Sequence, residues 1–313
     1  MSLFTHSYDF TKLKTIVYPR LSLIFILFML SSCDKFEGDQ TIPSYIAIDS
    51  LGFDAADDIQ GSSNQKIIDA WIYVDDNIIG GFELPARVPV LVNGIHKLEV
   101  RGGIMLNGIP ETRAPNPCWK PMIINAYNFT PDSISRFYNV TTYYENCSFV
   151  WMEDFEDASL AIKGSNNSDS GIVRTYPAGA PEALIEDFSQ YSGISYLDAD
   201  HPDLQLVSVS GSDEGYVFDR GDFIFLELNY KNTIPVVVGL YITLTDNTVE
   251  ERSFLIISPS DEWNKIYVNF TPIVNETTDA RDYTVYLEAS LPDGTEDAVI
   301  VLDNIKLVTR PNL

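Results

Sequence analysis

The chain has 313 residues, of which 20 are Lys or Arg and 45 are Asp or Glu, so its formal net charge at pH 7 is −25. Nucleic acid is not an expected partner, because binding to it depends on Lys and Arg contacts to phosphate. The same charge disfavours direct contact with anionic lipid. A strongly acidic surface favours solubility and the binding of cations.

The N-terminal segment has the three parts of a secretory signal. Lys12, Lys14 and Arg20 precede an apolar run over residues 21–30, and small residues follow this run. The order of basic, apolar and small-residue parts is typical of an exported protein. A transmembrane helix is the alternative, but it takes about 20 apolar residues to cross the hydrocarbon core, and this run is too short.

Leu30-Ser31-Ser32-Cys33 closes the apolar run and resembles the lipobox of bacterial lipoproteins. The resemblance implies that residues 1–32 are a removed signal peptide and that Cys33 is acylated. Several acyl chains would then hold the protein on a membrane of the cell envelope. Residues 33–43 are polar and lack a periodic pattern, which indicates a short tether. We expect the outer membrane; whether the protein faces the periplasm or the cell surface is left open.

Two further cysteines, Cys118 and Cys147, follow Cys33. An even number of cysteines outside the cytoplasm favours a disulfide, because that compartment is oxidising. Closing a loop of this length would stabilise the fold by about 3–4 kcal/mol. We therefore predict a Cys118–Cys147 disulfide, with two buried free thiols as the alternative.

Residues 44–150 form a first β-rich region. Over residues 68–75 the aliphatic side chains of Ile68, Ala70, Ile72 and Val74 alternate with acidic and aromatic ones, as in a half-buried strand. Asp75-Asp76-Asn77 then supplies turn residues. Residues 88–92 lead into Asn93-Gly94 and another alternating run, which predicts a β-hairpin.

The run from Trp71 through Gly80 and Pro85 to Asn93-Gly94-Ile95-His96 resembles PEGA-type β-sandwich modules. The resemblance implies a scaffold rather than a catalyst, and it leaves the ligand open. Residues 102–121 form a long connection rich in Gly, Asn and Pro. Long loops of this kind are often functional, so this one is either a contact surface or a structural crossover.

The region from residue 151 to the end consists mainly of predicted strands. Apart from a short predicted helix at 181–188, no helical periodicity is evident. Closely spaced strands of this kind are typical of sandwiches and jelly rolls. We predict an all-β chain of two β-sandwich domains in series, over residues 44–150 and 151–313, the second a jelly roll. Its predicted strands are 204–209, 223–230, 236–244, 253–257, 265–274, 283–291 and 298–308.

The second region has a further resemblance. Glu153-Asp154-Phe155-Glu156-Asp157 opens it, and Leu302-Asp303-Asn304-Ile305 lies near its end. This arrangement resembles galactose-binding-like jelly rolls, the fold of many carbohydrate-binding modules. The resemblance implies a structural calcium ion between Glu156 or Asp157 and Asp303, since Ca²⁺ prefers oxygen ligands. Solvated edge carboxylates are the alternative.

Aromatic side chains are the natural contacts for a sugar ring. Tyr191 and Tyr196 lie on a predicted loop, and Trp119 lies in the long connection. We take these three as candidate ligand contacts. Packing in the core is the alternative, because aromatic side chains bury large areas.

No catalytic motif stands out. After Cys33 only His96 and His201 remain, far apart and without zinc-ligand spacing. A nucleophile elbow and a phosphate-binding loop are both missing from the sequence. Paired carboxylates hydrolyse glycosides, but among so many acids no pair is informative. We therefore do not expect an enzyme.

Taken together, these features predict a membrane-anchored lipoprotein that is a non-catalytic structural or interaction component of the cell envelope. Its partners would be the membrane, through the lipid anchor, and an envelope protein. A glycan-binding accessory lipoprotein is the alternative reading, and a glycoside hydrolase comes third.

Overall fold

The computed structural model describes residues 41–56, 58–175, 184, 189–211 and 215–312. The predicted signal peptide, Cys33 and most of the predicted tether lie outside these residues, as does nearly all of the predicted helix at 181–188. The chain divides into two units, Met1–Pro43 and Ser44–Leu313. No helix within the described residues is both long and apolar enough to cross a bilayer.

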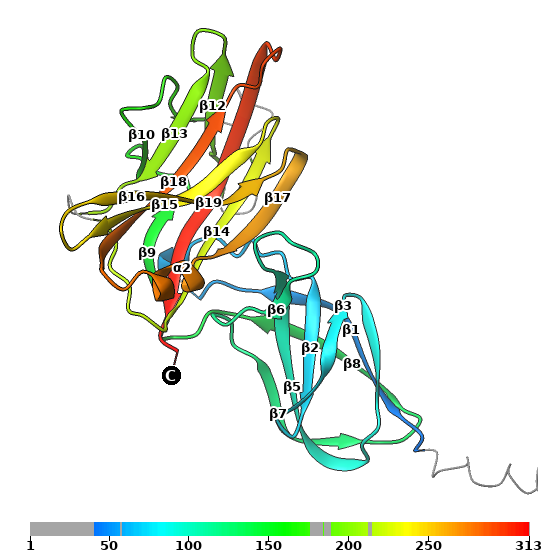
Figure 1. Ribbon diagram of the computed structural model, residues 1–313. Coiled ribbons are helices and arrows are strands. Elements are labelled where there is room, and N and C mark those ends of the chain that lie inside the picture. The colour runs from blue at the N-terminus through cyan, green and yellow to red at the C-terminus, as the bar shows by residue number, and fades with distance from the viewer. Residues whose placement is uncertain (1–40, 57, 176–183, 185–188, 212–214, 313) are drawn as a thin grey trace, which may run out of the picture. The chain divides into compact units, whose positions relative to one another are not determined.

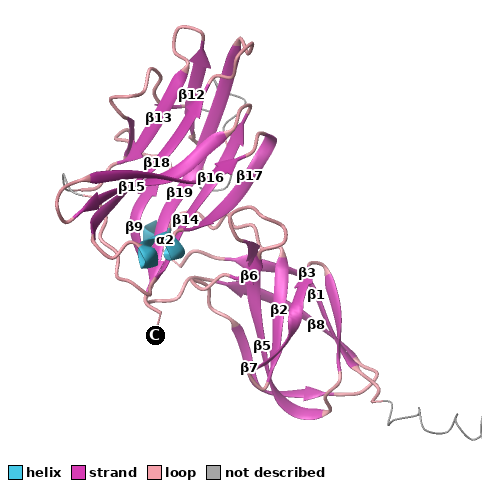
Figure 2. Ribbon diagram, viewed as in Figure 1, coloured by secondary structure: helices cyan, strands magenta, loops and turns pink. Residues whose placement is uncertain are grey.

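Strands dominate the described residues (Figure 1 and Figure 2). The helical elements are the 3-10 helix η1 (Asp58–Gln60) and the α-helix α2 (Thr271–Glu276). The strands are β1 Ser44–Phe53, β2 Asp69–Val74, β3 Asn77–Glu83, β4 Ala86–Val90, β5 Gly94–Met105, β6 Arg113–Pro115, β7 Met122–Phe129, β8 Ile134–Thr141, β9 Ser148–Glu153, β10 Ile162–Gly164, β11 Val173–Arg174, β12 Gly193–Asp198, β13 Asp203–Ser208, β14 Phe223–Asn232, β15 Val236–Leu244, β16 Val249–Ile257, β17 Ser260–Asn269, β18 Ala280–Ser290 and β19 Asp297–Arg310.

Strands β1 to β8 form a first β-sandwich. One sheet has the order β4-β1-β8, and the other has the order β3-β2-β5-β6, with β7 also pairing with β5. Strand β5 is long enough to pair with β7 along its first half and with β6 near its end. Alternate side chains along these strands point to one face, and those of Ile48, Ile72 and Leu98 fill the core between the two sheets.

Strands β9 to β19 form a second sandwich, a jelly roll. One sheet has the order β10-β13-β18-β15-β16, and the other has the order β11-β12-β19-β14-β17, with β9 also pairing with β19. Leu226 and Leu228 of β14 face the core between these sheets. Phe225 and Glu227 alternate with them and lie on the opposite side, which we call the outer face of the six-stranded sheet. The prediction of an all-β chain with two sandwiches is confirmed.

A third hydrophobic cluster covers part of the outer face. Phe225, Tyr267 and Val308 of the six-stranded sheet pack there with Ile104 and Trp119. The rings of Trp119 and Tyr267 meet edge to face, with centroids 5.7 Å apart. The two sandwiches therefore share buried apolar surface. The predicted domain boundary at 150/151 falls inside β9 and stays a prediction.

Two sequence predictions about strands are corrected. The runs around Asn93-Gly94 do not form a hairpin, because β4 pairs with β1 whereas β5 pairs with β2 and β7. At Gly94 (φ 92°) the chain passes from one sheet to the other. The predicted strand at 265–274 ends earlier, at Asn269, because Pro272 opens α2.

Candidate functional site

A polar hollow of about 460 Å³ opens beside the outer face of the six-stranded sheet. Five segments build it: the loop after β1, the irregular chain after η1, the turn after β9, the chain before β12, and the middle of β19. We call it the polar pocket. Carboxylates, hydroxyls and one side-chain amide dominate its lining, which consists of Asp54, Ala55, Ala56, Gly61, Ser62, Ser63, Asp154, Glu156, Ser189 and Asn304.

The turn after β9 places two carboxylates in this lining. Phe155 lies between Asp154 and Glu156 with a positive φ of 59°, although it is fully buried and is not glycine. The Glu153 carboxylate holds the turn by accepting hydrogen bonds from the backbone N–H groups of Phe155 (2.7 Å) and Ala161. Burial raises the pKa of Glu153. Strained backbone of this kind concentrates at functional sites.

A second set of contacts fixes Glu156. Arg174 donates hydrogen bonds to the carbonyl oxygens of Phe155 and Glu156. The Glu156 Oε1 atom accepts the backbone N–H groups of Gln190 (2.7 Å) and Tyr191 (2.9 Å). The turn is therefore tied on both sides, and its carboxylates are pre-positioned.

The middle of β19 supplies the amide of the pocket. Asn304 has a positive φ of 46°, is 2% exposed, and its Nδ2 atom has no hydrogen-bond partner among the described residues. Its backbone N–H donates to Oδ1 of Asp303 (2.6 Å). Asn is one of the few residues other than Gly that adopt this backbone region readily. An unpaired buried amide costs free energy, and a ligand that accepts its hydrogen bond would recover that cost.

Asp303 lies directly beside Asn304 and is fully buried. Its Oδ2 atom accepts hydrogen bonds from the hydroxyls of Ser189 (2.9 Å) and Ser192 (2.8 Å). Burial is the largest influence on this carboxyl, and it raises the pKa of Asp303 from 3.8 to about 7 despite these hydrogen bonds.

We call residues 61–66 the strap; its first three residues, 61–63, line the pocket. The strap has no regular secondary structure, and side chains of the outer face hold it. Lys306 Nζ donates to the carbonyl oxygen of Ser62 (2.6 Å), and the Tyr267 hydroxyl donates to Gln65 Oε1 (2.8 Å). The Gln65 amide in turn donates to Glu227 Oε2 (3.0 Å). Buried polar groups of the sheet thus find their partners in the strap.

Lys306 is an unusual cation for this position, since it is 2% exposed. Burial is the largest influence on its amine, and it lowers the pKa of Lys306 from 10.5 to about 7. The corresponding stability is present above the unfolded pKa and is lost as the pH falls through about 7. Near neutral pH this residue therefore carries only part of a positive charge.

The three predicted aromatic contacts are placed very differently. Trp119 is 3% exposed inside the third hydrophobic cluster, so it is not available to a surface ligand, which corrects that prediction. Tyr191 lies next to Glu156, and the Arg174 guanidinium covers its ring at 3.4 Å from the centroid. Tyr196 of β12 is 56% exposed. None of the three is among the residues that line the polar pocket.

The acids predicted to bind calcium are not gathered into one group. Asp157 is exposed, Glu156 lines the pocket, and Asp303 is buried under Ser189 and Ser192. Within the described part of the chain, no group of three or more His, Cys, Asp or Glu side chains is arranged to hold a metal ion.

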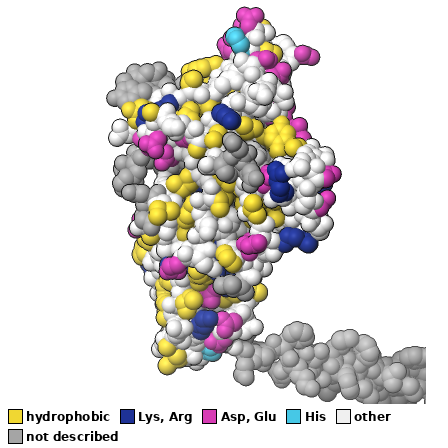
Figure 3. Space-filling model, turned by 90° about the vertical axis from the view of Figure 1, so that its left-hand side faces the viewer, with side chains coloured by type: hydrophobic (Ala, Val, Ile, Leu, Met, Phe, Trp, Pro, Cys, Tyr) yellow, Lys and Arg dark blue, Asp and Glu magenta, His cyan; other side chains and the backbone are white. Residues whose placement is uncertain are grey.

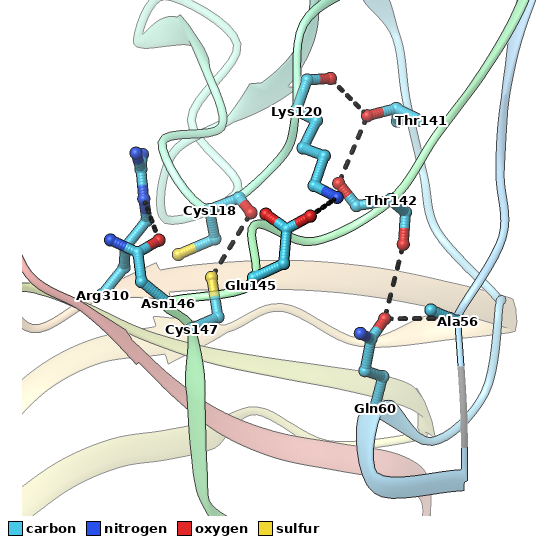
Figure 4. A network of polar contacts seen from close by, with 10 residues as sticks. All are labelled: Ala56, Gln60, Cys118, Lys120, Thr141, Thr142, Glu145, Asn146, Cys147 and Arg310. Atoms are coloured by element: carbon cyan, nitrogen blue, oxygen red, sulfur yellow. Dashed lines mark hydrogen bonds and ion pairs between the residues drawn. The ribbon is translucent and has the colours of Figure 1, made fainter.

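The predicted disulfide is not formed, because Cys118 and Cys147 are both free thiols (Figure 4). The Cys147 thiol is directed to the backbone and donates to the carbonyl oxygen of Cys118 at 3.4 Å. Hydrogen bonding with Cys147 and burial raise the pKa of Cys118 well above its usual value, so this thiol stays protonated. Neighbouring polar groups, among them Arg310 and Asn146 (3.1 Å), pin the same loops.

A smaller hollow of about 280 Å³ lies elsewhere on the six-stranded sheet. Val299 and Val301 of β19 line it, together with polar residues that include Lys231 and Asp261. On the molecular face shown in Figure 3, Lys and Arg side chains are scattered and do not gather into a basic patch.

Part of the polar pocket is visible in the amino-acid sequence. The acid-rich turn at 153–157 and the Asp303-Asn304 pair both stood out, but as calcium ligands. The strap has no periodic pattern, and Ser189 is one serine among many. Their roles depend on contacts between residues far apart in the chain.

Comparisons with known proteins give similarities of fold only. No family model matches the sequence, and no curated protein matches it. Among solved structures, the CBM22-1 xylan-binding domain of Paenibacillus barcinonensis Xyn10C is similar at 11% identity, over 54% of this chain and 99% of that one, with a TM-score of 0.37. The family 11 carbohydrate-binding module of the Clostridium thermocellum cellulase Lic26A-Cel5E is similar at 12% identity, over 50% and 92%, with a TM-score of 0.33. A cyclase from Fischerella sp. TAU is similar at 14% identity, over 53% and 98%, with a TM-score of 0.34.

Proposed function

We propose that this protein binds a carbohydrate in the polar pocket without acting on it chemically. The observation that supports this most is the lining of the pocket. Carboxylates and serine hydroxyls converge on one hollow with an amide whose Nδ2 atom has no partner among the described residues. Sugar hydroxyls both donate and accept hydrogen bonds, so they match this mixture of groups.

The construction of the pocket also favours binding. Ligand sites are concave and largely pre-formed, with a few fixed polar groups. Here the Glu153 carboxylate and Arg174 hold the turn that carries Asp154 and Glu156. A pre-organised site avoids part of the entropy cost of binding.

Affinity gel electrophoresis tests this proposal. Gels containing soluble xylan, mixed-linked β-1,3-1,4-glucan or glycol chitosan should retard the wild-type protein in at least one case. The Asp154→Asn variant keeps an acceptor for the Glu156 N–H but loses a charge. The affinity obtained from its retardation should therefore fall about tenfold, the loss expected for one charge-assisted hydrogen bond.

Asp261→Asn is the matched control, because it removes an equal charge at the smaller hollow. Its retardation should equal that of the wild type. Equal migration of the wild type in all gels and in a polysaccharide-free gel would contradict the proposed function for these glycans, and an equal loss in both variants would contradict the site.

We also propose that the protein is anchored to the cell envelope through acylated Cys33, which would place the pocket outside the cytoplasm. The support is the sequence Leu30-Ser31-Ser32-Cys33 and the basic and apolar residues before it. Cells grown with radiolabelled palmitate should incorporate label into the wild-type protein, and Cys33→Ser should abolish it. Unlabelled wild-type protein that retains its leader would contradict the anchor.

A further inference from the structure

The charge of the polar pocket is one-sided. Three of its lining residues, Asp54, Asp154 and Glu156, carry carboxylates, and no Lys, Arg or His is among the described residues that line it. A hollow lined by one sign of charge raises the local concentration of ligands of the opposite sign.

Two of these carboxylates keep one oxygen for a ligand. Among the described residues, Asp154 accepts the Glu156 N–H through Oδ1 (3.1 Å), and Glu156 accepts its backbone donors through Oε1. Within the part of the chain that the structure describes, their Oδ2 and Oε2 atoms have no hydrogen-bond partner. The turn therefore presents acceptors whose geometry is already fixed.

The nearby basic side chains, Arg174 and Lys306, make their hydrogen bonds to backbone carbonyl oxygens. Arg174 donates to two backbone carbonyl oxygens and stacks on Tyr191. Lys306 Nζ donates to the carbonyl oxygen of the lining residue Ser62, and its amine also interacts electrostatically with Asp154. Neither side chain forms an ion pair with Asp54, Asp154 or Glu156.

The lining distinguishes an organic cation from a metal ion. Asn304 brings to the same hollow an N–H donor that has no partner among the described residues, and a metal ion offers nothing to accept its hydrogen bond. A ligand that satisfies both kinds of group needs a positive charge with N–H donors together with oxygen acceptors.

We infer that the polar pocket selects an amino sugar, in which a protonated amine meets the carboxylates and the hydroxyl or ring oxygens accept from Asn304. This inference rests on the proposed function and narrows it. Acetylation of the amine removes the charge, so the N-acetylated sugar of equal length is the matched competitor.

The test is isothermal titration calorimetry with the glucosamine disaccharide and with N,N′-diacetylchitobiose. It is run at about pH 6, where a free amine is protonated, and in about 150 mM NaCl, which screens distant charges. The free amine should bind about tenfold more tightly than the acetylated sugar, as expected for one charge-assisted hydrogen bond. Asp154→Asn should remove most of this preference. Asp261→Asn removes one negative charge as well, and it should leave the preference unchanged.

Equal affinity for the two disaccharides would overturn the inference, as would an equal loss in both variants, which would show attraction by the overall negative charge. If neither disaccharide binds while a neutral polysaccharide retards the protein in gels, the inference fails and the proposed function stands. If Ca²⁺ competes with the amine at the pocket and is itself lost in Asp154→Asn, a metal site replaces the amino sugar.

Discussion

Replacing Asp303 by Asn should stabilise the protein, and the gain should grow as the pH rises from about 4 to about 7. The folded pKa is raised to about 7 from 3.8, chiefly by burial. The stability associated with this carboxyl is therefore fully present below the unfolded pKa and is lost as the pH rises through about 7. Asn is neutral at every pH, and the hydroxyls of Ser189 and Ser192 can reorient to accept its N–H.

The expected gain above pH 7 is on the order of 4 kcal/mol, from the difference between the folded and unfolded pKa values. Urea denaturation of both proteins over a series of pH values measures it. The exposed control Asp261→Asn should differ from the wild type by the same amount at each pH. A difference between Asp303→Asn and wild type that is flat with pH would show that Asp303 is ionised in the fold at an ordinary pKa.

Replacing Gly193 by Ala should destabilise the protein by about 2–3 kcal/mol and abolish the proposed carbohydrate binding. A Cβ atom at this position would lie 2.3 Å from two ring carbons of Phe155 and 2.6 Å from the side chain of Ile172. Phe155 is fully buried in a strained turn, so its ring can yield only if the turn moves. Asp154 and Glu156 would then leave their positions in the pocket.

Thermal or urea unfolding measures the stability loss, and affinity gels measure the binding. Gly171→Ala is the matched control, because a Cβ there has no atom within 4 Å. Adding Phe155→Leu to Gly193→Ala should recover part of the stability, since the two sites are in contact. A Gly193→Ala protein within about 0.5 kcal/mol of the wild type would contradict the proposed packing.

Much of the fold could be predicted from local patterns. The alternation along β2 and the turn residues Asp75 and Asp76 (φ 49° and 64°) are local signals, and the structure agrees with them. The pairing of strands is not local. Asn93-Gly94 predicted a hairpin, but burial of each strand against its own sheet decided the partners instead.

The candidate site was harder to predict, because it consists of contacts between distant segments. Asp303 was noticed as an acid near the end of the chain, but its burial under Ser189 and Ser192 depends on residues more than a hundred positions away. Trp119 is of a residue type that can stack on a sugar ring, yet it is buried in the third hydrophobic cluster. Cys118 and Cys147 lie close together, but sequence alone does not show how their sulfur atoms are directed.

The third hydrophobic cluster and the strap couple the unfolding of the two sandwiches. If Trp119 and Tyr267 became exposed to water, buried apolar surface of both sandwiches would be exposed at once. Glu227 and Lys306 would also lose their hydrogen-bond partners in the strap. We therefore expect the two sandwiches to unfold together in one cooperative transition.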